Sequence, residues 1–374
     1  MSTPGTGSDP MEREIDELRR LSLTGGGDSR GWKFNRDELY ERREEAVGEA
    51  PVPRVAALVL SYQGRDVTLG ALESLTRQDY PACDLAVIDN GSTDGTAEAV
   101  AAARPGVAVL RAAENRGPVG GVNLGLAWAR AGGYDYALVL NNDIEADPGL
   151  VGALVAAAEA DPTIGCVGPK AYYYRERDRI WSAGGRIRFR EAVTAEAGEG
   201  EVDRGQWDRD REVGYVNGCA MLIRRAALEA AGPWDPLYFL GVEDADFCLR
   251  VRRAGYRCWY AHRARLWHMV ARTAGGYKPA RTFNTGRNTA LFVRRWGSPR
   301  QKLRAALAAI ASLPLAFLRE LPRRNTAAVT AKARGFFAGL REPLPPPPRW
   351  DRPGDWSPPA AGPVPAAPGA AGAR

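Results

Sequence analysis

Between residues 54 and 160 the chain alternates strand-length apolar runs with segments that have the hydrophobic spacing of helices. The apolar runs are bounded by turn residues and cover 55–62, 84–90, 107–112 and 136–142. The helix-length segments cover 66–77, 94–104, 118–132 and 148–160. This βαβα alternation predicts an α/β fold with a mainly parallel, twisted sheet.

The pattern changes on both sides of this region. After about residue 165 short strands and a charged stretch, Glu191 to Arg211, suggest a half that faces an acceptor, and helical spacing returns at Pro279. We therefore divide the chain into an N-terminal charged appendage (1–50), a main domain (51–278), a C-terminal helical extension (279–342) and a Pro/Ala-rich tail (343–374). The composition of the tail predicts disorder.

Composition supports a globular, reduced protein. The hydrophobic content of 45% in 374 residues allows a sizeable core, and the net charge of +6 is too mild to indicate nucleic acid. The five cysteines are scattered, with no CxxC pair and no metal-type spacing. Histidine occurs only as His262 and His268, which disfavours a hydrolase triad.

Targeting signals are weak. The polar, acidic N-terminus does not resemble a signal peptide, so we expect a cytoplasmic protein. The longest apolar stretch, Ala305 to Leu318, is interrupted by Ser312 and Pro314 and is shorter than the ~20 residues needed to span a bilayer. It can still lie on a membrane surface, so membrane association stays open.

Polar side chains follow three of the predicted strands, where α/β sheets bind ligands. These ends read Ser61-Tyr62, Asp89-Asn90-Gly91 and Asn141-Asn142-Asp143. Asp89 is suited to hydrogen-bond a nucleobase or ribose. A purely structural interpretation makes Asn90-Gly91 a turn and Asp94 a helix cap. Both apply, with Asp94 capping and Asp89 binding.

The segment from Asn115 to Asn123 places several glycines before a helix. Free backbone N–H groups and the helix dipole favour an anion there, so it is a candidate neighbour of a diphosphate. It lacks the GxGxxG fingerprint, and glycine-rich turns commonly serve close packing instead.

Asn141-Asn142-Asp143 supplies oxygen ligands of the kind that hard divalent cations prefer. One carboxylate is too few to hold a metal alone, but a nucleotide diphosphate would add further oxygens. The alternative, a loop that caps the next helix, already has its candidate in Asp147.

A second acidic cluster, Glu243, Asp244 and Asp246, stands at a predicted helix start. Such carboxylates can favour the helix dipole, but clustering beside an apolar run also raises pKa values toward those of a general base. Either Asp244 or Glu243 could therefore deprotonate a hydroxyl. Trp267-His268 ends another strand-like stretch, and a lone histidine is more often structural than a ligand.

Together these segments resemble family 2 glycosyltransferases of the GT-A fold, notably the bacterial rhamnosyltransferase-like group, over residues 54 to 297. The resemblance implies a single nucleotide-diphospho-sugar-binding domain and C-terminal helices. It further implies inverting transfer from a dTDP- or UDP-linked sugar, rhamnose included, to a hydroxyl of a glycan, glycolipid or natural-product acceptor. The cofactor implied is a divalent metal, Mn²⁺ or Mg²⁺.

The resemblance also implies roles for individual residues. Asp143, in a DxD-like motif with Asn141 and Asn142, would bind the metal with His268, while Asp244 of the Glu243-Asp244 pair would be the base. By the same resemblance, the nucleoside would be contacted by Ser61, Tyr62 and Asp89, and Asn115 and Gly117 would lie beside the nucleotide. The floor of the sugar pocket would be formed by Gly218 and Cys219, after a strand at 212–217, and Trp234 would stack on the sugar. Arg287 and Asn288 would lie near the phosphates. Core packing of Trp234 and a solvated charge at Arg287 are the structural alternatives.

Two other functions remain open. A polyprenyl-phosphate glycosyltransferase at the membrane surface would use the same fold, with the Arg- and Leu-rich helices at 301–340. A non-catalytic nucleotide-sugar-binding partner subunit would bind without turnover. The expected partners are a nucleoside diphosphate sugar and its acceptor, with no nucleic acid, and with peripheral membrane contact and homo-oligomerisation left open.

Overall fold

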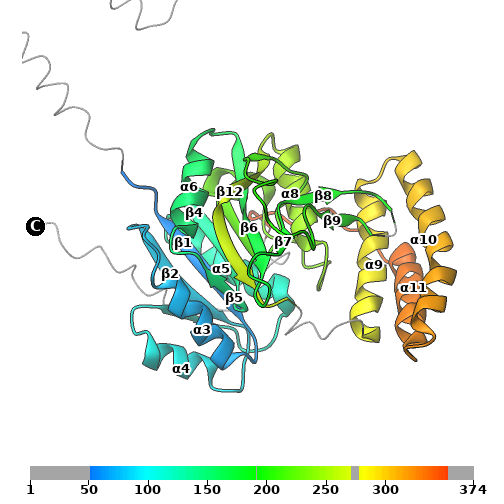
Figure 1. Cartoon of the computed structure of the whole chain (residues 1–374), viewed down its shortest axis with the longest axis horizontal. Helices are drawn as coiled ribbons and strands as arrows, with labels where there is room; N and C mark the ends of the chain where they lie inside the picture. The colour runs from blue at the N-terminus through cyan, green and yellow to red at the C-terminus, as the bar shows by residue number, and fades with distance from the viewer. Residues whose placement is uncertain (1–50, 191, 271–277, 353–374) are drawn as a thin grey trace, which may run out of the picture. The chain divides into compact units, whose positions relative to one another are not determined.

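A ten-stranded mixed sheet forms the centre of the computed structural model, which describes residues 51–190, 192–270 and 278–352 (Figure 1). Its strands are β1 Val55–Ser61, β2 Cys83–Asp89, β3 Ala108–Arg111, β4 Tyr136–Asn141, β5 Ile144–Ala146, β6 Ile164–Tyr173, β7 Ile180–Ser182, β10 Arg211–Glu212, β11 Ala220–Arg224 and β12 Arg257–His268. The order is β10-β12-β6-β11-β4-β1-β2-β3, with β5 on β12 and β7 on β6. β8 Gly185–Ile187 and β9 Thr194–Glu196 form a separate pair.

The N-terminal half is the predicted α/β unit. Strands β3, β2, β1 and β4 are parallel neighbours. The helices that follow the strands are α3 Arg65–Leu75, α4 Thr96–Ala103, α5 Gly117–Ala131 and α6 Leu150–Glu159. Alternate residues of β1 enter two cores, Leu58 on the side of α5 and Val59 on the side of α3 and α6. The parallel arrangement brings the ends of β1, β2 and β4 to one edge.

The second half corrects two expectations. β11 runs antiparallel between β4 and β6, and it starts at Ala220, after Gly218 and Cys219 instead of before them. The strand expected at 212–217 is mostly irregular. β6 was not predicted because Gly165, Gly168 and Pro169 interrupt its pattern. Its partner β12 has a register irregularity directly beyond Pro169, where the ladder lacks an N–H donor.

Two short helices precede the predicted helical extension: α7 Arg225–Ala231 and α8 Glu243–Arg253. The extension consists of α9 Pro279–Trp296, α10 Pro299–Glu320 and α11 Thr326–Arg341. α9 and α11 approach closely, since a Cβ on Gly286 or Gly335 would lie 2.0 Å from a backbone oxygen of the other helix. α10 buries only Ala305 and Glu320. Among the described residues, α10 is the one helix long and apolar enough to cross a membrane by length and composition.

The start of the Pro/Ala-rich tail is ordered against the domain. Trp350 Nε1 donates to the carbonyl of Leu228 in α7 over 2.9 Å, and the Arg130 guanidinium lies 4.3 Å from the Trp350 ring centre. The expected disorder from residue 343 is therefore wrong for 343–352, because Trp350 supplies an anchor that composition does not reveal. Residues 353–374 and the appendage 1–50 lie outside the described residues.

Candidate functional site

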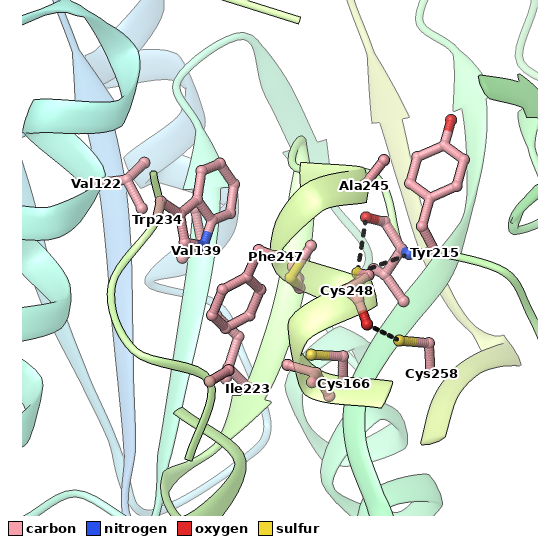
Figure 2. Packing of buried hydrophobic residues seen from close by; sticks show 14 of the residues in the cluster. Val122, Val139, Cys166, Tyr215, Ile223, Trp234, Ala245, Phe247, Cys248 and Cys258 are labelled. Atoms are coloured by element: carbon pink, nitrogen blue, oxygen red, sulfur yellow. Dashed lines mark hydrogen bonds between the residues drawn. The ribbon is translucent and has the colours of Figure 1, made fainter. Parts of the chain in front are cut away.

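The acidic start of α8 is held on a strained turn above the core. Gly241 and Val242 precede it with φ of 92° and 67°, a left-handed conformation that is costly for the β-branched Val242. Figure 2 shows Phe247 and Cys248 of α8 in the buried cluster beside Trp234. This anchoring fixes the direction in which the side chains of Glu243 and Asp244 point from the helix.

Asp244, the predicted base, accepts two backbone hydrogen bonds. Its Oδ2 accepts from the Gly218 N–H over 3.0 Å and its Oδ1 from its neighbour Ala245 over 2.7 Å. Burial, together with the nearby negative charge of Glu196, raises the pKa of Asp244 above its ordinary value. Burial, followed by the charge of Asp244, raises the pKa of Glu243 as well, and Glu243 Oε2 has no hydrogen-bond partner among the described residues.

The predicted metal ligands lie together. β5 pairs with the end of β12, and in this pairing His268 stands opposite Ile144. His268 Nε2 is therefore close to the residue that precedes Ile144, 3.0 Å from Asp143 Oδ1. Both side chains are buried, and His268 Nδ1 lacks a hydrogen-bond partner within the described part of the chain. Adjacent ligands of an octahedral cation with bonds of about 2.1 Å stand about 3.0 Å apart. The Asp143 and His268 donors therefore fit a shared Mg²⁺- or Mn²⁺-type ion.

Gly218 and Cys219 form a short segment that is hydrogen-bonded on one side to Asp244 and on the other to Asn141, near Asp143. The Cys219 carbonyl accepts from the Asn141 N–H over 3.0 Å, while the adjacent Gly218 N–H binds Asp244. Burial raises the pKa of the Cys219 thiol, and the charges of Glu196, Asp143 and Asp244 raise it further. Asp244 and the segment that carries Asp143, which are distant in sequence, are thus both hydrogen-bonded to one short connection.

Glu196, at the end of β9, is a site residue that the sequence did not reveal. Its carboxylate accepts hydrogen bonds from Tyr215 Oη and from Asn217 Nδ2, the latter over 3.1 Å, and from Ser182 Oγ. The residue belongs to the charged stretch from Glu191 to Arg211, in which no local pattern distinguishes one acidic residue from its neighbours. Its charge opposes ionisation of Asp244.

Replacing Glu196 with Gln is expected to lower the pKa of Asp244, because the opposing charge is lost while the hydrogen-bonding shape is kept. If Asp244 is the base, as predicted, the reaction needs its ionised form, so the acid limb of the pH profile of kcat/KM should move to lower pH. Glu199→Gln, at an exposed position of the same stretch, is the matched control. An acid limb that moves equally in both variants, or in neither, would contradict this role.

At the end of β2, Asp89 lies beside the Asn115 loop. Asp89 accepts from the Ser92 N–H over 3.0 Å and lies 3.8 Å from the Arg111 guanidinium. Asn90, which the sequence interpretation left in a turn, donates to Asn115 Oδ1 and to the Gly117 carbonyl. The nucleoside candidate and the glycine-rich loop are therefore brought to one edge.

Gly117 has a specific packing role. Its φ is 71°, and a Cβ there would lie 2.5 Å from the ring of Phe239, which is half exposed on the loop before α8. Phe239 thus links the glycine-rich loop to the base helix, a contact that the sequence did not indicate. Only glycine combines this backbone angle with so close an aromatic neighbour.

At the end of β1, Tyr62 is 40% exposed at the ligand edge, whereas Ser61 is fully buried. Ser61 Oγ hydrogen-bonds Thr68 Oγ1 over 2.8 Å, and Asn142 Nδ2 donates to the same Thr68 oxygen over 3.0 Å. The side chains expected to bind substrate at Ser61 and Asn142 instead tie β1, α3 and β4 together. They position their neighbours Tyr62 and Asp143.

Asn288 and Trp234 are corrections to the substrate-binding set. Asn288 is fully buried and donates to the carbonyls of Leu240 and Gly241 over 3.0 and 3.1 Å. Trp234 is 2% exposed and packs against Phe247, so its core interpretation holds. Both contribute by holding the turn into α8, because the Asn288 amide is bonded to backbone carbonyls and the Trp234 ring is packed in the core.

Arg287 and Asp246 also hold α8 in place. Arg287 donates to the Leu237 carbonyl over 2.9 Å and pairs with Glu342, so it holds the loop before α8 instead of facing phosphate. Asp246 is fully buried and lies 3.4 Å from Arg295 of α9, which also pairs with buried Asp235. The third carboxylate of the acidic cluster is thus a structural link between α8 and α9.

Three cysteines that are distant in sequence meet beneath α8. The sulfur atoms of Cys166, Cys248 and Cys258 all lie within 4.8 Å of one another, and the side chains are fully buried (Figure 2). The pKa of each thiol is raised well above its ordinary value, by burial and by hydrogen bonds among the thiols. Protonated thiols pack as small apolar groups, so we assign this cluster to the core.

Residues 57–231 match the model of the family described as Glycosyl transferase family 2. An N-acetylglucosaminyl-diphospho-decaprenol L-rhamnosyltransferase of Mycobacterium tuberculosis is 30% identical over 225 residues, which cover 54% of this chain and 72% of the relative.

Two further proteins are more distantly similar. A poly-beta-1,6-N-acetyl-D-glucosamine synthase of Staphylococcus aureus is 24% identical over 248 residues, covering 65% of this chain and 57% of the relative. The solved structure of a mannosyltransferase from Pyrobaculum calidifontis, in complex with GDP-Man and Mn²⁺, is similar with a TM-score of 0.49 and 19% identity. That similarity covers 81% of this chain and 94% of the other.

Proposed function

Because the chain belongs to glycosyl transferase family 2, we propose that it is an inverting transferase using a nucleoside diphosphate sugar, with Asp244 as base and Asp143 and His268 as metal ligands. The observation that supports this most is the short segment Gly218-Cys219: the Gly218 N–H binds Asp244, and the Cys219 carbonyl accepts from the N–H of Asn141, two residues before Asp143. A proton acceptor and a pair of candidate cation ligands therefore meet at one short segment.

In the proposed reaction, Asp244 removes the proton of the acceptor hydroxyl as that oxygen bonds to the anomeric carbon, and the bond to the nucleoside diphosphate breaks. A divalent cation, when bound at Asp143 and His268, would neutralise charge on the departing diphosphate. Asp89 and Tyr62 would contact the nucleoside, and the loop of Asn115 and Gly117 would lie beside the nucleotide. Gly218 and Cys219 would form the floor beneath the sugar.

We further propose a dTDP- or UDP-linked donor, rhamnose among the candidates, and a glycan, lipid-linked or small-molecule acceptor on the cytoplasmic side of a membrane. The name of the Mycobacterium tuberculosis relative, a rhamnosyltransferase acting on a decaprenol-linked acceptor, supports the sugar and the lipid-linked class. Transfer directly to a polyprenyl phosphate is a second candidate, favoured by the exposed apolar residues of α10.

A donor screen tests this proposal. Release of nucleoside diphosphate should be measured for UDP- and dTDP-linked sugars, dTDP-rhamnose included, with Mn²⁺ or Mg²⁺ and with a polyprenyl-diphosphate-linked sugar as acceptor. We expect turnover of one donor class that stops when the metal is chelated. Donor binding without turnover under every condition would instead support a non-catalytic binding subunit.

A further inference from the structure

Helix α10 presents a continuous apolar face to solvent. Leu303, Leu307, Ile310, Leu318 and Leu321 recur at helical spacing and are each 54–66% exposed. The two buried residues of the helix, Ala305 and Glu320, lie on its opposite side. We call this exposed stripe, with Pro314 between its halves, the α10 face. Its large side chains point away from the rest of the protein, which is unusual for a soluble surface.

The helical extension that carries the α10 face is strongly basic. Residues 278–341 contain fourteen Lys and Arg and a single acidic residue, Glu320, although the whole chain carries only +6. The remainder of the chain is therefore net acidic. Three exposed basic residues, Arg300, Lys302 and Arg304, stand at the start of α10, and Arg319, Arg323 and Arg324 stand at its end or just beyond.

We propose that α10 is a membrane-binding helix that lies in the plane of an anionic lipid surface, with the α10 face inserted and the flanking basic residues at the headgroups. Apolar insertion and attraction to anionic lipid would act together on this one element. A second copy of the chain fits the face poorly, because it would bring two strongly basic segments together.

The length of the helix supports an in-plane position. Fourteen residues separate Arg304 from Arg319, and at 1.5 Å per residue they extend about 21 Å, short of the ~30 Å hydrocarbon core. Basic side chains at both ends can reach the headgroups of one leaflet by extending their aliphatic stems. This inference goes beyond the proposed transfer reaction, since lipid binding needs neither donor nor acceptor.

Vesicle sedimentation of the full chain tests the proposal without any donor. We expect binding to vesicles of phosphatidylcholine with phosphatidylglycerol, much weaker binding to phosphatidylcholine alone, and a decline as salt is raised. The double variant Leu307→Glu/Ile310→Glu should reduce binding by about tenfold or more. Val202→Glu changes an exposed apolar residue outside α10 and should bind as the unmodified chain does.

Several outcomes would overturn the proposal. One is failure of the unmodified chain to bind anionic vesicles, as when another segment already covers the face. Another is equal binding by the double variant with an unchanged melting temperature. Self-association of the unmodified chain in solution that the double variant abolishes would assign the face to a second copy. Retention in vesicles through alkaline carbonate washing would show that α10 crosses the bilayer.

Discussion

Asp244→Asn is expected to lower the rate of sugar transfer by about 10²–10⁴-fold while leaving donor affinity nearly unchanged. The amide keeps the shape of the carboxylate that binds Gly218 and Ala245 but cannot accept the acceptor proton. Release of nucleoside diphosphate gives the rate, and calorimetry with metal present gives donor affinity. Asp161→Asn, at an exposed carboxylate paired with Arg257, is the control.

Stability measurements separate loss of chemistry from loss of folding. Because the pKa of Asp244 is higher in the folded chain, its contribution to stability is present below the unfolded pKa and lost as pH rises through the folded pKa. At neutral pH the ionised carboxylate therefore costs stability. The amide removes this cost but can accept only one of the two N–H bonds from Gly218 and Ala245, so the two effects oppose each other and the melting temperature should change little. Near-normal turnover of a folded Asp244→Asn variant would rule out the base assignment.

The second large effect is expected at the metal ligands. Asp143→Asn and His268→Gln should each weaken activation by Mn²⁺ by about 10²-fold, since each removes one protein ligand of the ion. Transfer rate is titrated with Mn²⁺, and Mn²⁺ binding in the presence of nucleoside diphosphate is followed by electron paramagnetic resonance.

A control for the histidine lies on the same strand. His262, also on β12, pairs with Asp210 instead of Asp143, so His262→Gln should leave metal activation unchanged. Full activity in the presence of a chelator would refute a metal-dependent reaction. Equal effects of His262→Gln and His268→Gln would refute the specific assignment of His268.

The parallel half of the fold was predictable because its signals are local. Strands β1 to β4 are short, mainly apolar runs that alternate with helices along the chain, and the strand predicted at 136–142 matches β4 to within one residue. β6 could not be recognised in this way. It buries Lys170, whose charge is balanced by Asp203 and Asp208 some thirty to forty residues later, a pairing that no local pattern contains.

The candidate site was predictable in its chemistry more than in its geometry. Residue types at strand ends and helix starts, with the family resemblance, indicated Asp143, His268 and Asp244. Glu196 and Asn288 could not be assigned in this way, because their importance depends on which distant atoms they meet. A buried amide that holds two backbone carbonyls and an accessible amide that binds phosphate look alike in sequence.

The buried link between α8 and α9 limits how this protein can be recombined with its relatives. A chimera that kept residues 51–278 and took a helical extension without an arginine at the position of Arg295 would leave Asp235 buried without its cation. Breaking a buried ion pair in this way costs about 3–5 kcal/mol. Asp235, Asp246 and Arg295 must therefore be exchanged together. Residues 51–278 and the helical extension are then one unit, both in protein engineering and in evolution.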